Sequence, residues 1–458
     1  MMTVQLSSEL GCFVSSLRYE DIPSEALRFI HYGFADCIAV MIAGRNETPP
    51  TLMQAILKPS AVESTVLFRP HKTSAQDAAW INGVAAHVLD YDDVALRGHP
   101  SCVLVPAIIA EAEALGAGGK KMMTAYAAGY ETWAELVRRD PDQHHTKGWH
   151  PTGIFGAIAA AAACASLRGL NAQQATHAIC LGASQSAGLM ANFGSMTKSY
   201  HAGRSAHSGV ISARLAHAGF TASPDGIEHP QGFLAAVSPL GNVDLSSPIE
   251  AGAKWKLPRS RISIKKYPTC FATHRAIDGI LDLLKVHAVR PNQVKKVNAS
   301  VSRRNTAILR NHSPQTGLAA KFSMEFAMAS ALIAGRVTLA ELTDEFVSRQ
   351  DVQDLMKRVT VIPDDRMDPN PNANGYAIYD QVTIETVDGR NLAGEQINLV
   401  RGGADRPLEQ SELWDKFQGC LTAGDFDQDL IKPLFQALMT LEHCSDARAL
   451  VSQFSATP

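Results

Sequence analysis

The spacing of apolar residues predicts a helical chain up to about residue 250. Apolar residues recur at the spacing of one helix face from Ala26 to Met41, with Pro23 before this stretch and Gly44 at its end. Asn171-Ala-Gln-Gln has the pattern of a capping box at the start of a later helix. We therefore predict a bundle of packed helices over residues 1–264.

After residue 264 the pattern changes to one of mixed strands and helices. Residues 294–301 and 358–362 have the β-branched content of strands, and 381–393 predicts a hairpin with an Asp-Gly turn. Helical patterns at 273–286 and 322–334 lie between them, and helical spacing returns after Ser411. The predicted fold is mainly α with a second α+β domain: helices over 1–264, α+β structure over 265–400 and a helical tail over 401–458.

Composition narrows the class of protein. The 458 residues suggest two domains, and 46% hydrophobic with 19% charged residues is ordinary for a globular enzyme. A net charge of -3 argues against a nucleic-acid partner. The eight cysteines form no CxxC pair, which fits a reducing cytoplasm. We expect a cytoplasmic location and no membrane association, because the N-terminal residues lack a signal-peptide pattern and the apolar stretch Ile154–Ala165 is shorter than the roughly 20 residues of a membrane span.

One polar cluster is unusually dense. Residues 86–101 contain two His, three Asp and one Arg and lead directly into an apolar stretch. Such groups need partners when buried, so the segment is either a structural network at a helix end or an active site, and we predict the active site. If the helix continued through Asp93, then His87, Asp90 and Asp93 would share one face. An Asp-rich helix could hold Mg²⁺, but no second acidic motif completes a coordination shell, so we predict no metal.

Three further segments combine cationic or titratable side chains. Gly148-Trp-His-Pro-Thr-Gly contains His150 shortly after two other histidines, and imidazoles titrate near neutral pH. Met196-Thr-Lys-Ser-Tyr-His-Ala-Gly contains Lys198, which either extends to solvent or holds an anion. Lys265-Lys-Tyr-Pro-Thr-Cys-Phe-Ala-Thr-His lies where the helical domain meets the α+β domain, and interdomain clefts often bind ligands. A lone His is more often a structural residue than a catalytic one.

These segments occur in the order found in a known family. His87-x-x-Asp-Tyr-Asp-Asp with Gly98-His-Pro-Ser, followed by the three blocks above and a weaker Ala320-Lys-Phe-Ser-Met, resembles the MmgE/PrpD family. That family includes 2-methylcitrate dehydratases, cis-aconitate decarboxylases and iminodisuccinate epimerase. The resemblance implies that the tail returns to the helical domain, that the α+β domain is an insertion, and that the protein is a homodimer without a cofactor.

The resemblance also implies roles for individual residues. It assigns four catalytic positions, Asp90, His99, His150 and Lys198. We predict five substrate-binding residues, Arg97, His145, His201, Lys265 and His274, of which Lys265 matches a substrate-binding lysine of the family. We expect Asp90 to orient a neighbouring His, and we regard Lys321 and Ser323 as weaker candidates for which capping or packing is an equal alternative. Val94 departs from the Thr of many members, so one substrate hydrogen bond of those members is expected to be absent here.

Together these residues indicate proton transfer at a carbon next to a carboxylate. Fixed Lys, Arg and His stabilise the enediolate-like charge, and His serves as acid or base near neutral pH. The sequence contains no Walker, GxGxxG or GxSxG pattern. We predict a cofactor-free lyase of the dehydratase type acting on a di- or tricarboxylate. The alternatives are an epimerase of an iminodisuccinate-like substrate, a cis-aconitate-type decarboxylase and a non-catalytic carboxylate-binding protein.

Overall fold

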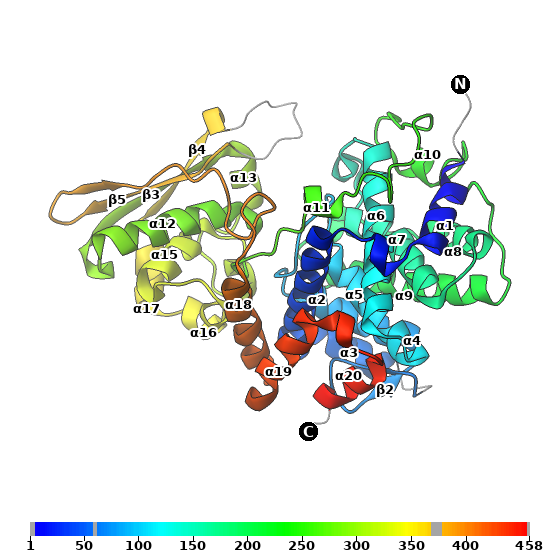
Figure 1. Ribbon diagram of the computed structural model, residues 1–458. Helices are drawn as coiled ribbons and strands as arrows, with labels where there is room; N and C mark the ends of the chain where they lie inside the picture. Colours follow the sequence, from blue (N-terminus) through cyan, green and yellow to red (C-terminus); the bar gives the residue numbers. More distant parts are fainter. Residues whose placement is uncertain (1–4, 58–61, 368–377, 456–458) are drawn as a thin grey trace. The chain divides into compact units, whose positions relative to one another are not determined.

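The protein consists of two compact units (Figure 1). The computed structural model describes residues 5–57, 62–367 and 378–455. The helical unit comprises residues up to Ser263 together with the tail from Gln410, and the α+β unit comprises Ile264–Glu409. The predicted fold class, a helical bundle completed by a returning tail plus a smaller α+β unit, is confirmed.

Long helices form the helical unit. Its first part contains α1 (Leu6–Ser16), α2 (Ser24–Gly44), α3 (Thr48–Ile56), α4 (Ala75–Val88), α5 (Ser101–Leu115), α6 (Gly119–Arg139), α7 (Pro151–Arg168), α8 (Ala172–Ser184), α9 (Thr197–His217), α10 (Phe233–Val237) and α11 (Leu257–Ser260). The tail adds α18 (Gln410–Ala423), α19 (Gln428–Met439) and α20 (Ala447–Ser455). A short antiparallel pair, β1 (Ser64–Thr65) with β2 (Lys72–Thr73), lies between α3 and α4. Several short 3-10 turns, among them η1 (Tyr19–Asp21), η2 (His144–Lys147) and η3 (Met190–Asn192), connect these helices.

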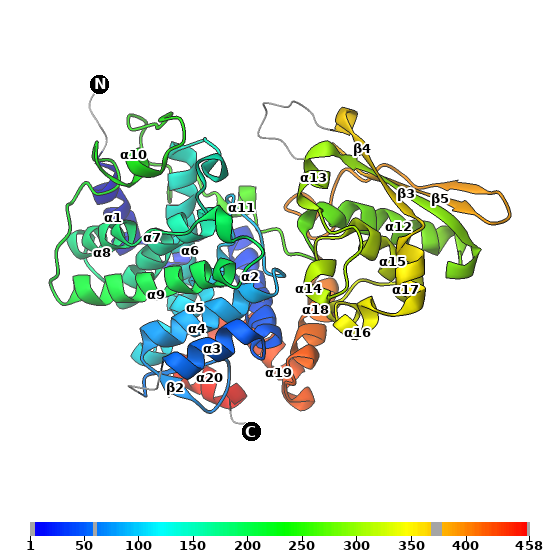
Figure 2. The same ribbon diagram turned by 180° about the vertical axis from the view of Figure 1, so that it is seen from behind.

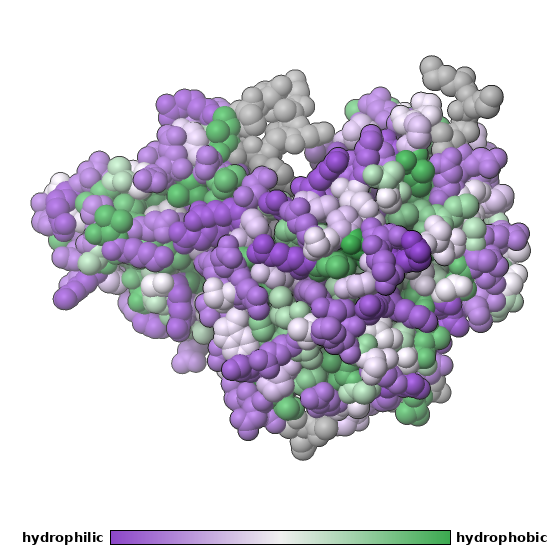
Figure 3. All heavy atoms as spheres, in the orientation of Figure 1, coloured by the Kyte–Doolittle hydropathy of each residue, from purple (hydrophilic) through white to green (hydrophobic). Residues whose placement is uncertain are grey.

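Local sequence signals agree with the helix ends. The predicted capping box is present at α8, where Asn171 and Gln174 exchange side-chain and backbone hydrogen bonds. Pro23 precedes α2, and α2 ends at Gly44 as predicted. The polar residues of the unit lie mainly on its outside, and Figure 3 shows one face on which hydrophilic side chains separate scattered apolar ones.

Two helices of the helical unit are long and apolar enough to cross a membrane by length and composition. They are α2 and α7, and 83% and 89% of their most apolar windows are buried inside the protein. The stretch around Ile154 is therefore part of an 18-residue helix, longer than the apolar run alone suggested. Its near-complete burial is that of a central core helix, as expected for an Ala-rich segment that packs closely with its neighbours.

Glycines bring α4 and α9 close together. A Cβ atom on Gly203 of α9 would lie 2.3 Å from the carbonyl oxygen of Trp80 and 2.7 Å from Val84 Cγ2 on α4. A Cβ atom on Gly83 would lie 2.7 Å from the Cα of Gly203. Figure 2 shows α9 beside α4, α7 and α8 in this unit. Because residues four apart share a helix face, this contact also directs His87 of α4 towards α9.

The α+β unit contains a four-stranded sheet in the order β4-β3-β5-β6. The strands are β3 (Val294–Ser302), β4 (Val359–Asp364), β5 (Gln381–Thr386) and β6 (Asn391–Ala393); β3 and β4 are parallel and the other pairs antiparallel. Helices α12 (His274–His287) and α15 (Met324–Ala334) cover one face (Figure 1). Shorter helices complete the unit: α13 (Arg303–Ile308), α14 (Gly317–Ala320), α16 (Asp344–Val347) and α17 (Gln350–Met356). The predicted strands, helices and Asp-Gly hairpin are all present, with Gly389 at φ +85° in the turn.

The boundary after the α+β unit differs from the predicted one. We assigned residues 401–409 to the helical tail, but they belong to the α+β unit. The reason is local pairing: the Arg401 backbone N–H donates to Asp278, and its guanidinium donates to Asp282 at 2.7 Å. Both carboxylates lie on α12, so the chain stays with this unit until α18 begins.

Candidate active site

The polar segment after α4 is a loop rather than a helix. Helix α4 ends at Val88, and Asp90 has φ +52°, in the left-handed region that disfavours a residue with a Cβ. The expectation that His87, Asp90 and Asp93 share a helix face is therefore wrong. The loop runs from residue 89 to 100 and ends where α5 begins at Ser101.

Asp92 lies between two imidazoles. Its carboxylate is 2.9 Å from His87 Nδ1 and 3.1 Å from His99 Nδ1. The His87 contact is a well-formed hydrogen bond, while the His99 contact has ion-pair distance with a poorer angle. Asp92 and His87 are fully buried, whereas the His99 side chain retains 13% exposure. Asp92 is thus a carboxylate that holds a histidine and that the sequence did not single out for this role, while the role expected for Asp90 stays a prediction.

Electrostatics fix the charge states of this group. Burial lowers the pKa of His87 to about 4, outweighing the attraction of Asp92, so His87 is neutral at pH 7. Despite burial, the neighbouring imidazoles His87 and His99 hold the pKa of Asp92 well below its usual range. An ionised Asp92 that accepts Nδ1–H bonds leaves the Nε2 atoms of both rings as bases. Of the two rings, His99 is the one that solvent reaches.

Asp93 points the opposite way and anchors the loop. It accepts hydrogen bonds from the Ser101 hydroxyl at 2.9 Å and the Ser101 backbone N–H, at the start of α5. The Ser101 hydroxyl also lies 2.7 Å from the Tyr126 hydroxyl. Burial, with the nearby carboxylates Asp36 and Asp92, raises the pKa of Asp93 well above its usual value. Asp93 therefore has a structural role at the start of α5.

Asp90 pairs with the predicted lysine. Lys198 Nζ at the start of α9 lies 2.7 Å from Asp90 Oδ1, and both side chains are about one-sixth exposed. The same ammonium lies 5.3 Å from the centre of the Phe193 ring. A half-buried ammonium held beside a carboxylate and an aromatic face is a fixed positive charge near the imidazoles. The structure therefore brings together two residues 108 positions apart that the sequence predicted as catalytic.

His150 and His201 form a second imidazole pair. Their Nδ1 atoms lie 3.1 Å apart, so one ring donates its proton to the other. Burial lowers the pKa of both, which makes the pair neutral near pH 7. The accepting ring then carries its proton on Nε2 and is a hydrogen-bond donor there. A glycine is required beside the pair, because a Cβ on Gly188 (φ +137°) would lie 3.2 Å from the His201 ring.

The two imidazole groups are neighbours. The rings of His87 and His150 stack with centroids 6.0 Å apart and an interplanar angle of 21°. The site therefore contains four histidines, two carboxylates and one lysine, all within the helical unit. One ligand atom from each of His87, Asp90, Asp92 and His99 lies within 4.8 Å of the others, a spacing that would accommodate a divalent cation. The ammonium of Lys198 beside Asp90 opposes a second cation there.

Two predicted substrate-binding residues lie at the edge of this cluster. The Arg97 guanidinium donates to the carbonyl oxygens of Asp140, Pro141 and Asp142 and so holds the chain before η2. Its substrate-binding role stays a prediction. His145 in η2 is half-buried, and burial together with His144 and Arg97 lowers its pKa. His145 remains a candidate.

The remaining predicted residues belong to the α+β unit. Lys265 is 2% exposed there. His274 is fully buried, with its ring against Tyr267 and Phe271 and Nε2 3.3 Å from the Thr269 carbonyl oxygen. These contacts are those of a core residue, and the substrate-binding role of His274 stays a prediction.

The weaker candidates of that unit have structural contacts. The Ser323 hydroxyl accepts from the Phe326 N–H and caps α15, which is the capping alternative. Lys321 is buried, and its carbonyl oxygen accepts from the Cys270 N–H.

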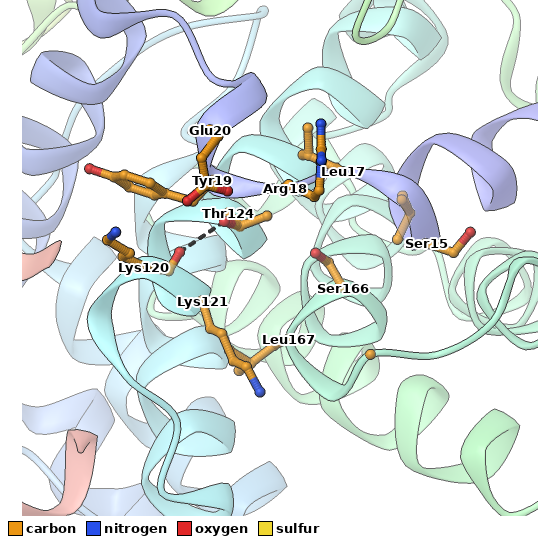
Figure 4. A pocket seen from close by; sticks show the side chains of 12 residues that line it. Ser15, Leu17, Arg18, Tyr19, Glu20, Lys120, Lys121, Thr124, Ser166 and Leu167 are labelled. Carbon is orange, nitrogen blue, oxygen red and sulfur yellow. Dashed lines mark hydrogen bonds between the residues drawn. The ribbon is translucent and has the colours of Figure 1, made fainter. Parts of the chain in front are cut away.

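A hollow elsewhere in the helical unit contains none of the predicted residues. It has a volume of about 320 Å³ and is lined by the end of α1, η1, the start of α6 and the end of α7. Figure 4 shows Lys120 and Lys121 of α6 with Tyr19 of η1, and Thr124 bonded to the Lys120 carbonyl oxygen. Lys120 Nζ lies 5.0 Å from the Tyr19 ring centre. Among the described residues that line this hollow there is no histidine and a single carboxylate, Glu20, so it does not resemble the imidazole cluster of the candidate active site.

Sequence reasoning missed three residues around the site. His87 and Asp92 lie in the singled-out segment, but the assumed helix pointed them elsewhere. His87 and Asp92 are five positions apart, and only a chain that turns after Val88 brings them into contact. The third, Lys416, comes from the tail and gave no local signal.

Comparison with known proteins gives the family. The MmgE/PrpD N-terminal domain matches residues 8–246 and the MmgE/PrpD C-terminal domain matches residues 267–432. A cis-aconitate decarboxylase of Homo sapiens is 26% identical over 84% of this chain and 81% of its own. A cis-aconitate decarboxylase of Aspergillus terreus is 24% identical over 97% of this chain and 95% of its own. With both domain models matched over most of its length, the chain belongs to the MmgE/PrpD family.

Proposed function

We propose that the protein is a cofactor-free lyase that transfers a proton at a carbon next to a carboxylate of a di- or tricarboxylate, most simply a dehydratase. The observation that carries this proposal is the arrangement of a solvent-reachable His99 against a buried, ionised Asp92, beside the fixed charge of Lys198. Membership of a family whose matched relatives are cis-aconitate decarboxylases supports a lyase acting on such substrates.

Each group has a part in the proposed reaction. His99 Nε2 removes the proton, and the Lys198 ammonium stabilises the enediolate-like charge that develops on the carboxylate. The neutral His150–His201 pair, with an Nε2–H on the accepting ring, donates a hydrogen bond to the departing hydroxyl, and the proton that His99 removed joins this hydroxyl to leave as water. The C–H and C–O bonds break and a C=C bond forms, so no electrons are gained or lost overall.

Decarboxylation is the second candidate, and the names of the matched relatives favour it. There the C–C bond to a carboxylate breaks, CO₂ leaves, and the same acid returns a proton to the resulting carbanion. The two reactions use the same charges and differ in the leaving group.

A panel of polycarboxylates followed by NMR in D₂O tests the proposal. A new alkene signal with release of water indicates dehydration, and loss of CO₂ with one deuterium incorporated indicates decarboxylation. Deuterium in recovered substrate without an alkene would indicate an epimerase instead. Binding of the panel without any turnover would leave only a carboxylate-binding protein and contradict the proposed lyase.

Independence from metal needs its own experiment, because His87, Asp90, Asp92 and His99 offer ligand atoms to a cation. We expect dialysis against EDTA to leave the rate unchanged, since Lys198 supplies the positive charge that a metal would supply. Loss of activity that Mg²⁺, Zn²⁺ or Fe²⁺ restores would assign this cluster as a metal centre.

A further inference from the structure

We propose that Lys416, on α18 of the C-terminal tail, is a positioning residue for the catalytic loop. The inference rests on the proposed function of that loop. Its chemical role is to fix the peptide between Tyr91 and Asp92, so that the two carboxylates on either side of Tyr91 face different partners.

The contacts of Lys416 are specific and buried. Its Nζ donates to the Tyr91 carbonyl oxygen at 2.8 Å and lies 4.0 Å from the centre of the Tyr91 ring. The same ammonium lies 2.5 Å from Asp36 Oδ1 on α2. Lys416 is 7% exposed and Asp36 is fully buried. A lysine with three donors thus joins the tail, the core helix α2 and the loop at one atom.

The loop needs such a restraint because its conformation is strained. Asp90, directly before Tyr91, has φ +52°, and Leu96 and Arg97 further along have φ +49° and +65°. Non-glycine residues in this region are disfavoured by the clash of their Cβ atom with the backbone and persist only where surrounding contacts hold them.

If the peptide after Tyr91 rotated, Asp90 and Asp92 would lose the contacts that they make with their separate partners. Asp90 reaches Lys198 on one side, and Asp92 reaches His87 and His99 on the other. A shift of about 1 Å at a reacting group can lower a rate roughly 100-fold. Removal of the Lys416 hydrogen bond should therefore reduce turnover although Lys416 touches no substrate.

An alternative is that Lys416 only neutralises Asp36. Three variants separate the two roles: Asp36→Asn, Lys416→Met, and both together. Asp36→Asn keeps the lysine and its bond to Tyr91, so we expect a rate within about threefold of the original. Lys416→Met leaves the Asp36 carboxylate without its ammonium, and we expect both a lower melting temperature and a rate at least tenfold lower.

The double variant gives the decisive comparison. Because it removes both charges, its melting temperature should recover towards that of Asp36→Asn, while its rate stays at least tenfold below that variant. Amide hydrogen exchange of residues 89–93 should remain faster than in Asp36→Asn. If Lys416→Met does not fold, this comparison alone tests the proposal, since the two proteins differ only in the lysine.

Recovery of both rate and exchange protection in the double variant would overturn the proposal and leave Lys416 as a charge partner of Asp36. Normal exchange with a reduced rate would also overturn it, because the loop would then be unaffected. If no substrate is found, the exchange measurement still tests the restraint, so its failure and failure of the proposed lyase can be told apart.

Discussion

At the scale of residues, the hydrogen bonds of Asp92 decide which nitrogen of each imidazole is free to act. We expect Asp92→Asn to reduce the rate strongly, because the His99 imidazole loses the carboxylate that lies beside its Nδ1. Each substitution raises the activation free energy by some amount. If Asp92 acts through His99, the variant that carries both Asp92→Asn and His99→Asn should raise it by less than the sum of the two single increases.

The same set of variants, measured for kcat and KM over pH, includes a matched control. Asp93→Asn changes the next carboxyl group, which faces Ser101 rather than the imidazoles, so the pH profile of this variant should keep its shape. Additive losses for Asp92 and His99 would mean that the carboxylate is structural. The predicted involvement of His150 gives a second test: His150→Asn should lose most of the rate, because the hydrogen bond between the His150 and His201 rings is lost.

Lys198 is predicted to matter for the rate far more than for stability. Removal of one group that stabilises a developing oxyanion typically costs about 10²–10³ in rate. Its partly exposed pair with Asp90 contributes about 1 kcal/mol or less to folding. We therefore expect Lys198→Met to melt near the original temperature and to turn over at least about 100-fold more slowly. Near-normal turnover would remove Lys198 from the site.

At the scale of elements, the site depends on how closely α4 and α9 pack. In Gly203→Ala, the new Cβ would lie 2.3 Å from a backbone oxygen of α4, so the helices must separate. We expect a loss of roughly 1–3 kcal/mol in the free energy of unfolding, together with a lower rate because His87 and Lys198 move apart. Gly419→Ala in α18 meets no atom within 4 Å and should stabilise by up to about 1 kcal/mol. Urea unfolding and steady-state kinetics of both variants test this prediction. Equal changes in the free energy of unfolding and in the rate for Gly203→Ala and Gly419→Ala would contradict it.

Helices, strands and the hairpin could be predicted from the sequence because their signals are local: apolar spacing, the Asn171 cap and the Asp388-Gly389 turn. The loop after α4 could not, since Asp90 adopts a conformation that its own sequence disfavours and that contacts with distant residues stabilise. The contacts of Asp92 with His87 and His99 follow from that single turn. Lys416, 325 residues away from Tyr91, could be recognised only from the fold.

At the scale of the whole molecule, two buried ionisable groups make the stability of the fold change with pH in opposite directions. The pKa of His87 is lowered to about 4 in the folded protein, so stability is lost as pH falls from its usual value near 6.5 towards 4. The pKa of Glu131 on α6 is raised by burial to about 7, so its contribution is present below about 4.5 and is lost as pH rises through 7. The helical unit should therefore be most stable between about pH 4.5 and pH 6.5, where the two effects offset each other.

Glu131 provides the test of this balance. Its carboxylate accepts the backbone N–H groups of Lys256 and Leu257 at 2.8–3.0 Å, and a glutamine oxygen can accept the same bonds without a charge. We expect Glu131→Gln to reduce the stability difference between pH 5 and pH 8 by on the order of 2–3 kcal/mol, because each pKa unit corresponds to about 1.4 kcal/mol. Calorimetry should show a melting temperature raised by a few degrees at pH 8 and nearly unchanged at pH 5, whereas the exposed Glu47→Gln should change neither. A glutamine variant that is equally destabilised at both pH values would show that Glu131 acts only through its hydrogen bonds and carries no buried charge at pH 8.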